Sequence, residues 1–176
     1  MTRKKRLLSF LAFLGIFTVS YSIGAEMPVT DEDAMEFLKE FQLAIEGIDA
    51  VGIFAHNISI ALPMFIPGFG IAWGGFAAWS TGFAFSALVT TTPTLSQIPP
   101  LTLLYLSPFG VMELVAYSVG MSRSFILIQT ILKKKSIKLE LTPTAIEVGI
   151  VVALLLVGGF IEFMMIEEFS DPQLPL

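Results

Sequence analysis

Two glutamates lie inside long apolar stretches of this chain, where a carboxylate is costly and therefore chemically informative. Glu113 is near the centre of one stretch, and Glu162 is close to the end of another. A charged carboxylate costs on the order of a few kcal/mol in hydrocarbon, so Glu113 is expected to face the protein interior and to be protonated, paired or hydrogen-bonded. Glu162 could meet polar groups of a neighbouring span. Glu113 could belong to a proton or ion relay, or it could make a structural hydrogen bond that holds helices in register.

His56 and Asn57 stand side by side in an earlier apolar stretch. Asn57 is a candidate for a hydrogen bond between helices, whereas a lone His in such a place is more often a packing residue than a ligand. With one His and no Cys, disulfides and thiolate chemistry are excluded and a metal site is not expected. The motifs His-Glu-x-x-His and Gly-x-Ser-x-Gly are absent, so we expect no enzymatic activity and no cofactor. No nucleic-acid partner is expected either.

The elements that carry these residues are membrane helices. Residues 50–112 contain no Asp, Glu, Lys or Arg, and a soluble domain cannot hide so long an uncharged run. As helix it would reach roughly 95 Å, about three crossings of a ~30 Å hydrocarbon core. The chain as a whole is 55% hydrophobic and 14% charged, with a mean hydropathy of +0.80. We therefore predict an all-α, polytopic integral membrane bundle.

Five membrane-spanning segments are predicted, together with a short external amphipathic helix. The spans are 7–25, 51–66, 71–91, 101–122 and 143–166. In terms of organisation, the expected parts are a basic N-terminus (1–6), a first transmembrane helix (7–25), an external acidic segment (26–50), a four-helix core (51–168) and an external tail (169–176). The first helix is interpreted as a retained anchor; a cleaved signal peptide would leave four spans with the same orientation. Pro108 is expected to kink the fourth span close to Glu113.

Charge segregation sets the predicted orientation in the cell membrane. Five alternating crossings place nine of the ten basic residues on one side and the acidic clusters on the other. The positive-inside rule then puts the N-terminus in the cytoplasm and the C-terminus outside. Four lysines follow the fourth span and would orient the chain and attract anionic lipid headgroups: Lys133, Lys134, Lys135 and Lys138. Glu147 is expected simply to reach the membrane interface.

Two patterns predict contacts outside and inside the bilayer. Residues 30–49 alternate acidic and apolar positions at helical spacing, with Thr30 as a cap, which indicates an external helix on the rim of the bundle or a docking face for a partner. Within the third span, small residues recur at intervals of four: Gly70, Gly74, Ala78, Gly82 and Ser86. Such a seam lets another helix approach closely, whether within the chain or in a second subunit.

Three blocks of sequence resemble the stage II sporulation protein M family of prokaryotic multi-pass membrane proteins. They are Ile-Phe-Ala-His-Asn at 53–57 with the glycine-rich turn at 65–75, Pro-Phe-Gly-Val-Met-Glu-Leu at 108–114, and Gly-Phe-Ile-Glu at 159–162. The resemblance covers roughly 51–165 and implies that Asn57, Gly110, Glu113 and Glu162 are family positions. The family usually has His where this chain has Phe109, so any His–Glu pair is lost here.

The resemblance implies a membrane scaffold, which in sporulating bacteria works with cell-wall-degrading partners during engulfment. We therefore expect a non-enzymatic scaffold or accessory subunit whose partners are the lipid bilayer and other membrane-protein subunits, or further copies of itself. The alternative is a small oligomeric transporter or channel that uses Glu113. An intramembrane enzyme is the weakest of the three interpretations.

Overall fold

A computed structural model describes residues 3–170 of the 176-residue chain, and helices joined by short connections make up this range. It forms seven α-helices and two short 3-10 helices, with no β-strand between residues 3 and 170. The predicted all-α class is therefore confirmed. The elements are α1 (Arg3–Ala25), α2 (Asp31–Ile45), α3 (Ala50–Ala61), η1 (Leu62–Phe65), α4 (Phe69–Thr91), η2 (Pro93–Gln97), α5 (Pro100–Leu106), α6 (Pro108–Leu132) and α7 (Lys138–Ser170). Most of the predicted tail, 169–176, lies outside the described residues.

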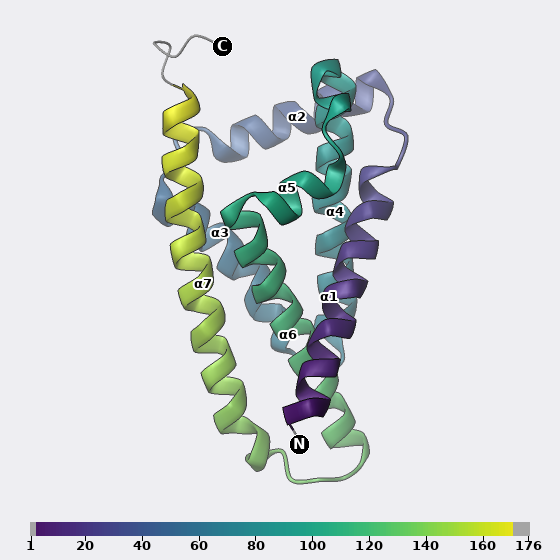
Figure 1. Ribbon diagram of the computed structural model, residues 1–176, viewed down its shortest axis with the longest axis vertical. Coiled ribbons are helices and arrows are strands. Elements are labelled where there is room, and N and C mark those ends of the chain that lie inside the picture. Colours follow the sequence, from purple (N-terminus) through teal and green to yellow (C-terminus); the bar gives the residue numbers. More distant parts are fainter. Residues whose placement is uncertain (1–2, 171–176) are drawn as a thin grey trace.

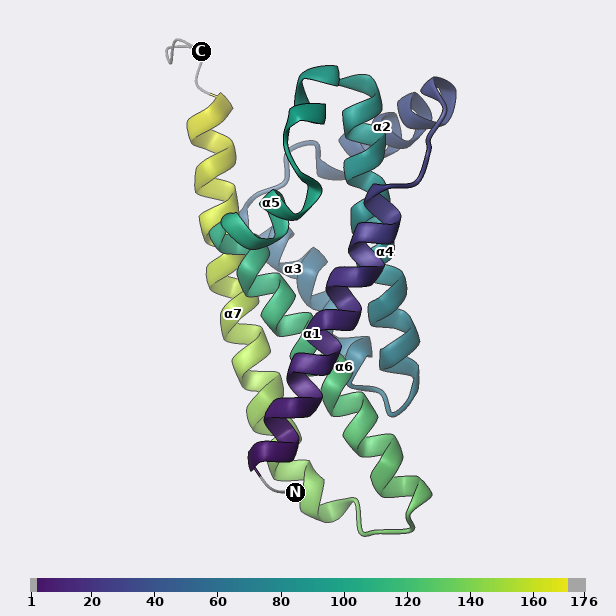
Figure 2. The ribbon, with the colours of Figure 1, turned by 45° about the vertical axis from the view of Figure 1, so that its right-hand side comes forward.

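The helices form an elongated bundle with two distinct ends (Figure 1). α1, α4, α6 and α7 follow the long axis, α2 lies across one end, and α3 and α5 occupy the middle. The start of α1 and the α6–α7 connection share the opposite end, as the turned view in Figure 2 also shows. α1 packs on α4 and α6, while α7 packs on α6 and α3. We call the end that holds the α6–α7 connection the basic end, because it contains Arg3–Arg6 and Lys133–Lys138.

Among the described residues, three helices are long and apolar enough to cross a membrane: α1, α6 and α7. This supports the assignment as a membrane protein, whereas the five predicted spans are not confirmed. α4 has 23 uncharged residues but is rich in Gly, Ser and Thr, which lower its hydropathy. Apolar side chains along α1 and α7 face outward, among them Val19 (60% exposed) and Met164 (66% exposed). Such outward faces are what a lipid solvent requires.

The second predicted span, 51–66, forms a shorter helix than expected. α3 has 12 residues, about 18 Å at the α-helical rise, which is well below a ~30 Å hydrocarbon core. Pro63 then enters the 3-10 turn η1, and Gly68, at φ 80°, reverses the chain into α4. This turn is anchored inside the bundle, because the Ser124 hydroxyl of α6 donates to the carbonyl of Ile66 at 2.6 Å. The break between the predicted spans 51–66 and 71–91 is confirmed at Gly68, whereas the end of α3 at Ala61 was not predicted.

The fourth span was predicted as one helix over 101–122 with a kink at Pro108, and this prediction was wrong: the structure has two separate helices, α5 and α6. The chain breaks completely at Ser107, whose ψ of 135° is extended, and α6 then runs on to Leu132. The Ser107 hydroxyl caps α6 by accepting from the Gly110 amide at 3.0 Å, and Pro108 occupies the first turn, where no donor is needed. Glu113 therefore lies in the second turn of α6 rather than at the centre of one long helix, and Arg123 lies inside α6.

A Ser107→Ala variant is expected to lower the free energy of unfolding by about 1 kcal/mol, because the Gly110 amide loses its acceptor at the start of α6. The measurement is the midpoint of unfolding by sodium dodecyl sulfate, followed by circular dichroism. Ser107→Thr keeps a hydroxyl at the cap and should stay close to the parent. Equal losses in the two variants would show that the hydroxyl does not act as a cap.

The predicted external amphipathic helix corresponds to α2, at the end of the bundle opposite the basic end (Figure 1). Thr30 precedes the helix, and its hydroxyl accepts from the Asp33 amide at 3.2 Å. Ala34 is completely buried and Phe37 makes an edge-on ring contact with Phe83 of α4, with centroids 5.7 Å apart. α2 is therefore held on the bundle by α4, while Met35 on it remains 66% exposed.

Candidate functional site

Three of the predicted site residues meet in the middle of the bundle. The Asn57 side-chain amide of α3 donates to a carboxylate oxygen of Glu113 on α6 at 2.8 Å. The Glu113 carboxylate also interacts electrostatically with that of Glu162 on α7. Asn57 is buried, and both glutamates are half-buried. We call Asn57, Glu113 and Glu162 the central cluster; it joins three helices that are far apart in sequence.

A glycine on α7 lies one turn before Glu162, where this helix packs on α3. An added Cβ at Gly159 would lie 3.2 Å from the backbone nitrogen of Phe54, which is tighter than an ordinary contact. At Gly158, which faces α6, an added Cβ would lie 3.6 Å from the Cβ of Met112, which is an ordinary contact. Gly159 therefore allows the close approach of α7 to α3 beside the central cluster.

Tyr117 adds a hydroxyl group to the surroundings of the central cluster, and sequence reasoning missed it. It follows Glu113 by four residues on α6, so both lie on one helix face. Its side chain is 4% exposed and interacts electrostatically with both carboxylates. The spacing of four residues is the signal that could have found it.

His56 and Phe109 take no polar part in this cluster. The His56 side chain is exposed on α3, although it neighbours Asn57 in sequence. Phe109 lies in the first turn of α6, near Gly158 of α7, and is half-buried. Within residues 3–170 there is also no group of three or more His, Cys, Asp or Glu that could hold a metal ion. The chemistry open to the cluster is the acceptance of hydrogen bonds by its carboxylates, as Glu113 does from Asn57.

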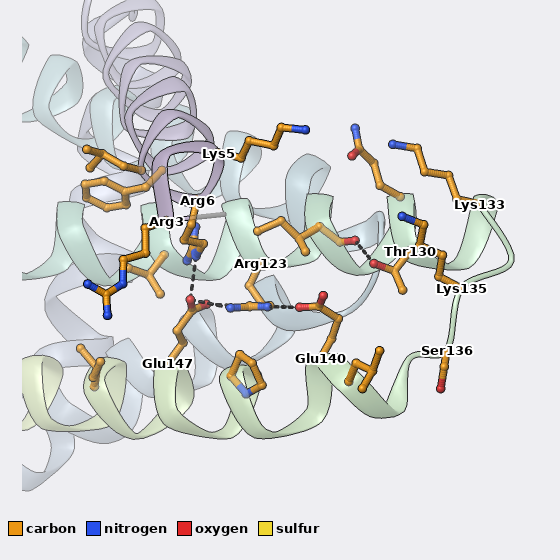
Figure 3. A pocket seen from close by; sticks show the side chains of 18 of the residues that line it. Arg3, Lys5, Arg6, Arg123, Thr130, Lys133, Lys135, Ser136, Glu140 and Glu147 are labelled. Carbon is orange, nitrogen blue, oxygen red and sulfur yellow. Dashed lines mark hydrogen bonds and ion pairs between the residues drawn. The ribbon is translucent and has the colours of Figure 1, made fainter. Parts of the chain in front are cut away.

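A second polar group, which sequence reasoning missed, lies toward the basic end. Arg123 of α6 is only 3% exposed, and its guanidinium forms two bonds to Glu147, at 2.7 and 2.6 Å, and one to Glu140, at 2.8 Å. Arg6 of α1 bonds Glu147 through Nε at 2.7 Å and the Ser122 hydroxyl through Nη1 at 2.7 Å. Figure 3 shows Arg123 between the two carboxylates. We call Arg6, Ser122, Arg123, Glu140 and Glu147 the ionic network.

The ionic network corrects the prediction that Glu147 simply reaches the membrane interface. Two charged bonds to one guanidinium, and a third from Arg6, make this carboxylate the link between α1, α6 and α7. The sequence held a signal for it. Glu140 and Glu147 are seven residues apart and so share one face of α7, while Arg123 stands between two serines in an apolar helix. We interpreted Arg123 only as an orientation signal and Glu147 only as a residue at the membrane interface.

The four predicted headgroup lysines lie at the α6–α7 connection and are exposed: Lys133, Lys134, Lys135 and Lys138. They do not share one environment. Lys133 and Lys135 line a cavity between the helix ends, whereas Lys134 and Lys138 do not. Lys134 occupies the left-handed region at φ 52°, where the chain turns between the two helices.

The seam of small residues on α4 meets several neighbours within the chain. An added Cβ at Gly70 would meet the backbone of Met64, and one at Gly74 the side chain of Met121. At Gly82 it would meet the carbonyl oxygen of Tyr21 on α1 at 2.0 Å. Steps of four residues rotate by about 40° beyond a full turn, so successive positions face η1, α6 and then α1. Ala78 is fully buried, and the Ser86 hydroxyl donates to the Met27 carbonyl at 2.6 Å.

No protein-family model matches this chain, and it matches no curated protein and no solved structure.

Proposed function

We propose that the chain is a non-enzymatic scaffold or accessory subunit of a membrane complex, of the stage II sporulation protein M type. It would sit in the cell membrane with its basic end in the cytoplasm and α2 outside, since nine of the ten basic residues fall on the cytoplasmic side of this arrangement. The chain alternates in direction along the long axis of the bundle (Figure 1). Its five successive stretches are α1, α3–η1, α4, α5–α6 and α7, and their alternation supports the five-pass topology.

The observation that carries this proposal is that interior polar side chains are used to join helices. Asn57–Glu113 joins α3 to α6, and Arg123–Glu147 joins α6 to α7. The Tyr21 hydroxyl donates to the Pro100 carbonyl at 2.9 Å and joins α1 to α5. Polar bonds of this kind fix the relative positions of membrane helices. A scaffold subunit needs helices in fixed relative positions, because its partners bind to the surfaces that these helices form.

Copurification tests the proposal. The protein would be solubilised from native membranes in mild detergent and its companions identified by mass spectrometry. A partner at constant stoichiometry is the expected result. Recovery of a homogeneous assembly of this chain alone would contradict the scaffold proposal.

Glu113→Gln is expected to retain both the partner and the fold, because a glutamine oxygen can still accept the Asn57 amide. Stability should fall by less than about 1 kcal/mol. Glu113→Ala serves as the contrast, since it leaves the buried Asn57 amide unsatisfied and should cost about 1–3 kcal/mol. The measurements are partner stoichiometry and the unfolding midpoint in detergent. Loss of the partner from a folded Glu113→Gln protein would mean that the carboxylate charge itself is required.

The second candidate is a small oligomeric transporter or channel, and the paired carboxylates of the central cluster favour it. Glu113 lies near the start of α6, next to the break at Ser107, and the short helix α3 supplies Asn57. Interrupted helices that end near carboxylates are typical of transport sites. In liposomes, this candidate predicts that Glu113→Gln abolishes flux while the protein remains folded. Unchanged flux in that variant would rule it out.

A further inference from the structure

A cavity of about 1140 Å³ lies at the basic end, between α1, α6, α7 and the connection that joins α6 to α7 (Figure 3). Six cationic side chains line it against two acidic ones. In the sequence, these cations were interpreted as signals that orient the chain in the membrane. The fold gathers them around one space.

The two acidic side chains do not neutralise the rim of this cavity. Glu140 and Glu147 are held by Arg123 and Arg6 in the ionic network. No ion pair among residues 3–170 involves Arg3, Lys133 or Lys135, and all three side chains are exposed. The rim therefore carries unneutralised positive charge from both α1 and the α6–α7 connection. A ligand that bridges these two elements would have to be anionic.

The walls of the cavity are apolar below this rim. Leu7 and Phe10 of α1 line one part, and Val119 of α6 and Ile150 of α7 line others. A small inorganic anion would make no favourable contacts with such apolar walls. An amphipathic molecule with an anionic head and hydrocarbon chains fits both parts of the cavity.

We propose that this cavity binds an anionic phospholipid, with its phosphate held by Lys133 and Lys135 of the connection and its acyl chains along the apolar walls, which include Leu7 and Phe10 of α1. Basic pockets between membrane helices are known to take phosphate headgroups, and a phosphate accepts charge-assisted hydrogen bonds from Arg and Lys. The bound lipid would join the start of α1 to the α6–α7 connection. This inference depends on neither the scaffold nor the transport proposal.

The chain supplies a matched control for the test. The rim variant Lys133→Gln/Lys135→Gln removes the two cations of the connection that line the cavity. The control variant Lys134→Gln/Lys138→Gln removes the same charge beside them, at exposed residues that do not line the cavity. Loss of general attraction to anionic lipid would weaken lipid binding equally in both variants. Loss of a specific site would weaken it in the rim variant alone.

The experiment is native mass spectrometry of the full-length protein in detergent, titrated with phosphatidylglycerol or with phosphatidylcholine. The parent is expected to bind one phosphatidylglycerol in preference to phosphatidylcholine. The rim variant should weaken this binding by about 10- to 100-fold, and the control variant by less than about 3-fold. Equal weakening in both variants, or equal binding of the two lipids by the parent, would overturn the proposal.

A separate arm distinguishes the lipid from free phosphate. Inorganic phosphate at millimolar concentration is expected to leave phosphatidylglycerol bound and to produce no thermal stabilisation. If phosphate alone stabilises the parent but not the rim variant, and displaces the lipid, the ligand is a free phosphate compound and the lipid assignment is wrong.

Discussion

A Glu147→Gln variant is expected to lose about 3–5 kcal/mol in the free energy of unfolding, the loss typical of breaking a buried ion pair from one side. Glu147 accepts two bonds from Arg123, which is 3% exposed, and one from Arg6. A glutamine amide would turn a donor toward these donors and leave the buried guanidinium without its main counter-charge. The measurement is the midpoint of unfolding by sodium dodecyl sulfate, followed by circular dichroism.

Glu140→Gln is the matched control, because it removes the negative charge from the single bond that Glu140 accepts from Arg123 and leaves the two-bond contact with Glu147 in place. Its expected cost is about 1–2 kcal/mol. The triple variant Arg123→Met/Glu140→Met/Glu147→Met should be more stable than Glu147→Gln, since both partners of the buried Arg123 are removed with it, and Arg6 is more exposed and still bonds Ser122. Comparable losses for Glu147→Gln and Glu140→Gln would refute the view of Glu147 as the central acceptor.

The all-α membrane character could be predicted because lipid constrains composition so strongly: a run of 63 uncharged residues would leave a water-soluble domain without the charged side chains that cover its surface. Asn57, Glu113 and Glu162 could also be singled out, since polar residues are rare and costly in such stretches. That Asn57 meets Glu113 could not be derived from periodicity, because the contact depends on how α3 packs against α6, 56 residues further along the chain.

The ionic network escaped prediction for a different physical reason. An Arg beside a membrane span usually signals orientation, and only the continuation of α6 past Ser122 turns Arg123 into an interior residue. Its partners come from 17 and 24 residues away, and Arg6 reaches Glu147 across 141 residues. The break before α6 was within reach of sequence reasoning, since Ser107 followed by Pro108 is a common start for a helix.

The packing of α1 on α4 leads to the second large prediction. A Gly82→Ala variant is expected to lose about 3 kcal/mol or more in the free energy of unfolding, near the upper end of the usual cost of overpacking. An added Cβ at Gly82 would lie 2.0 Å from the Tyr21 carbonyl oxygen and 2.8 Å from the Ala25 amide nitrogen. Both atoms belong to the α1 backbone, which cannot rotate away as a side chain could. The helices would have to separate, and in lipid close packing is the main force that holds them together.

Gly75→Ala provides the control in the same helix. Its nearest neighbour would be the Ser20 hydroxyl at 3.9 Å, which is an ordinary contact. Since alanine favours helix over glycine by up to about 1 kcal/mol, this variant should be neutral or slightly stabilised. Detergent-solubilised protein unfolded with sodium dodecyl sulfate gives both midpoints under one set of conditions. If the two alanines shift the midpoint equally, the cost belongs to the glycine-to-alanine change itself, and the close approach of α1 to α4 is not what stabilises the bundle.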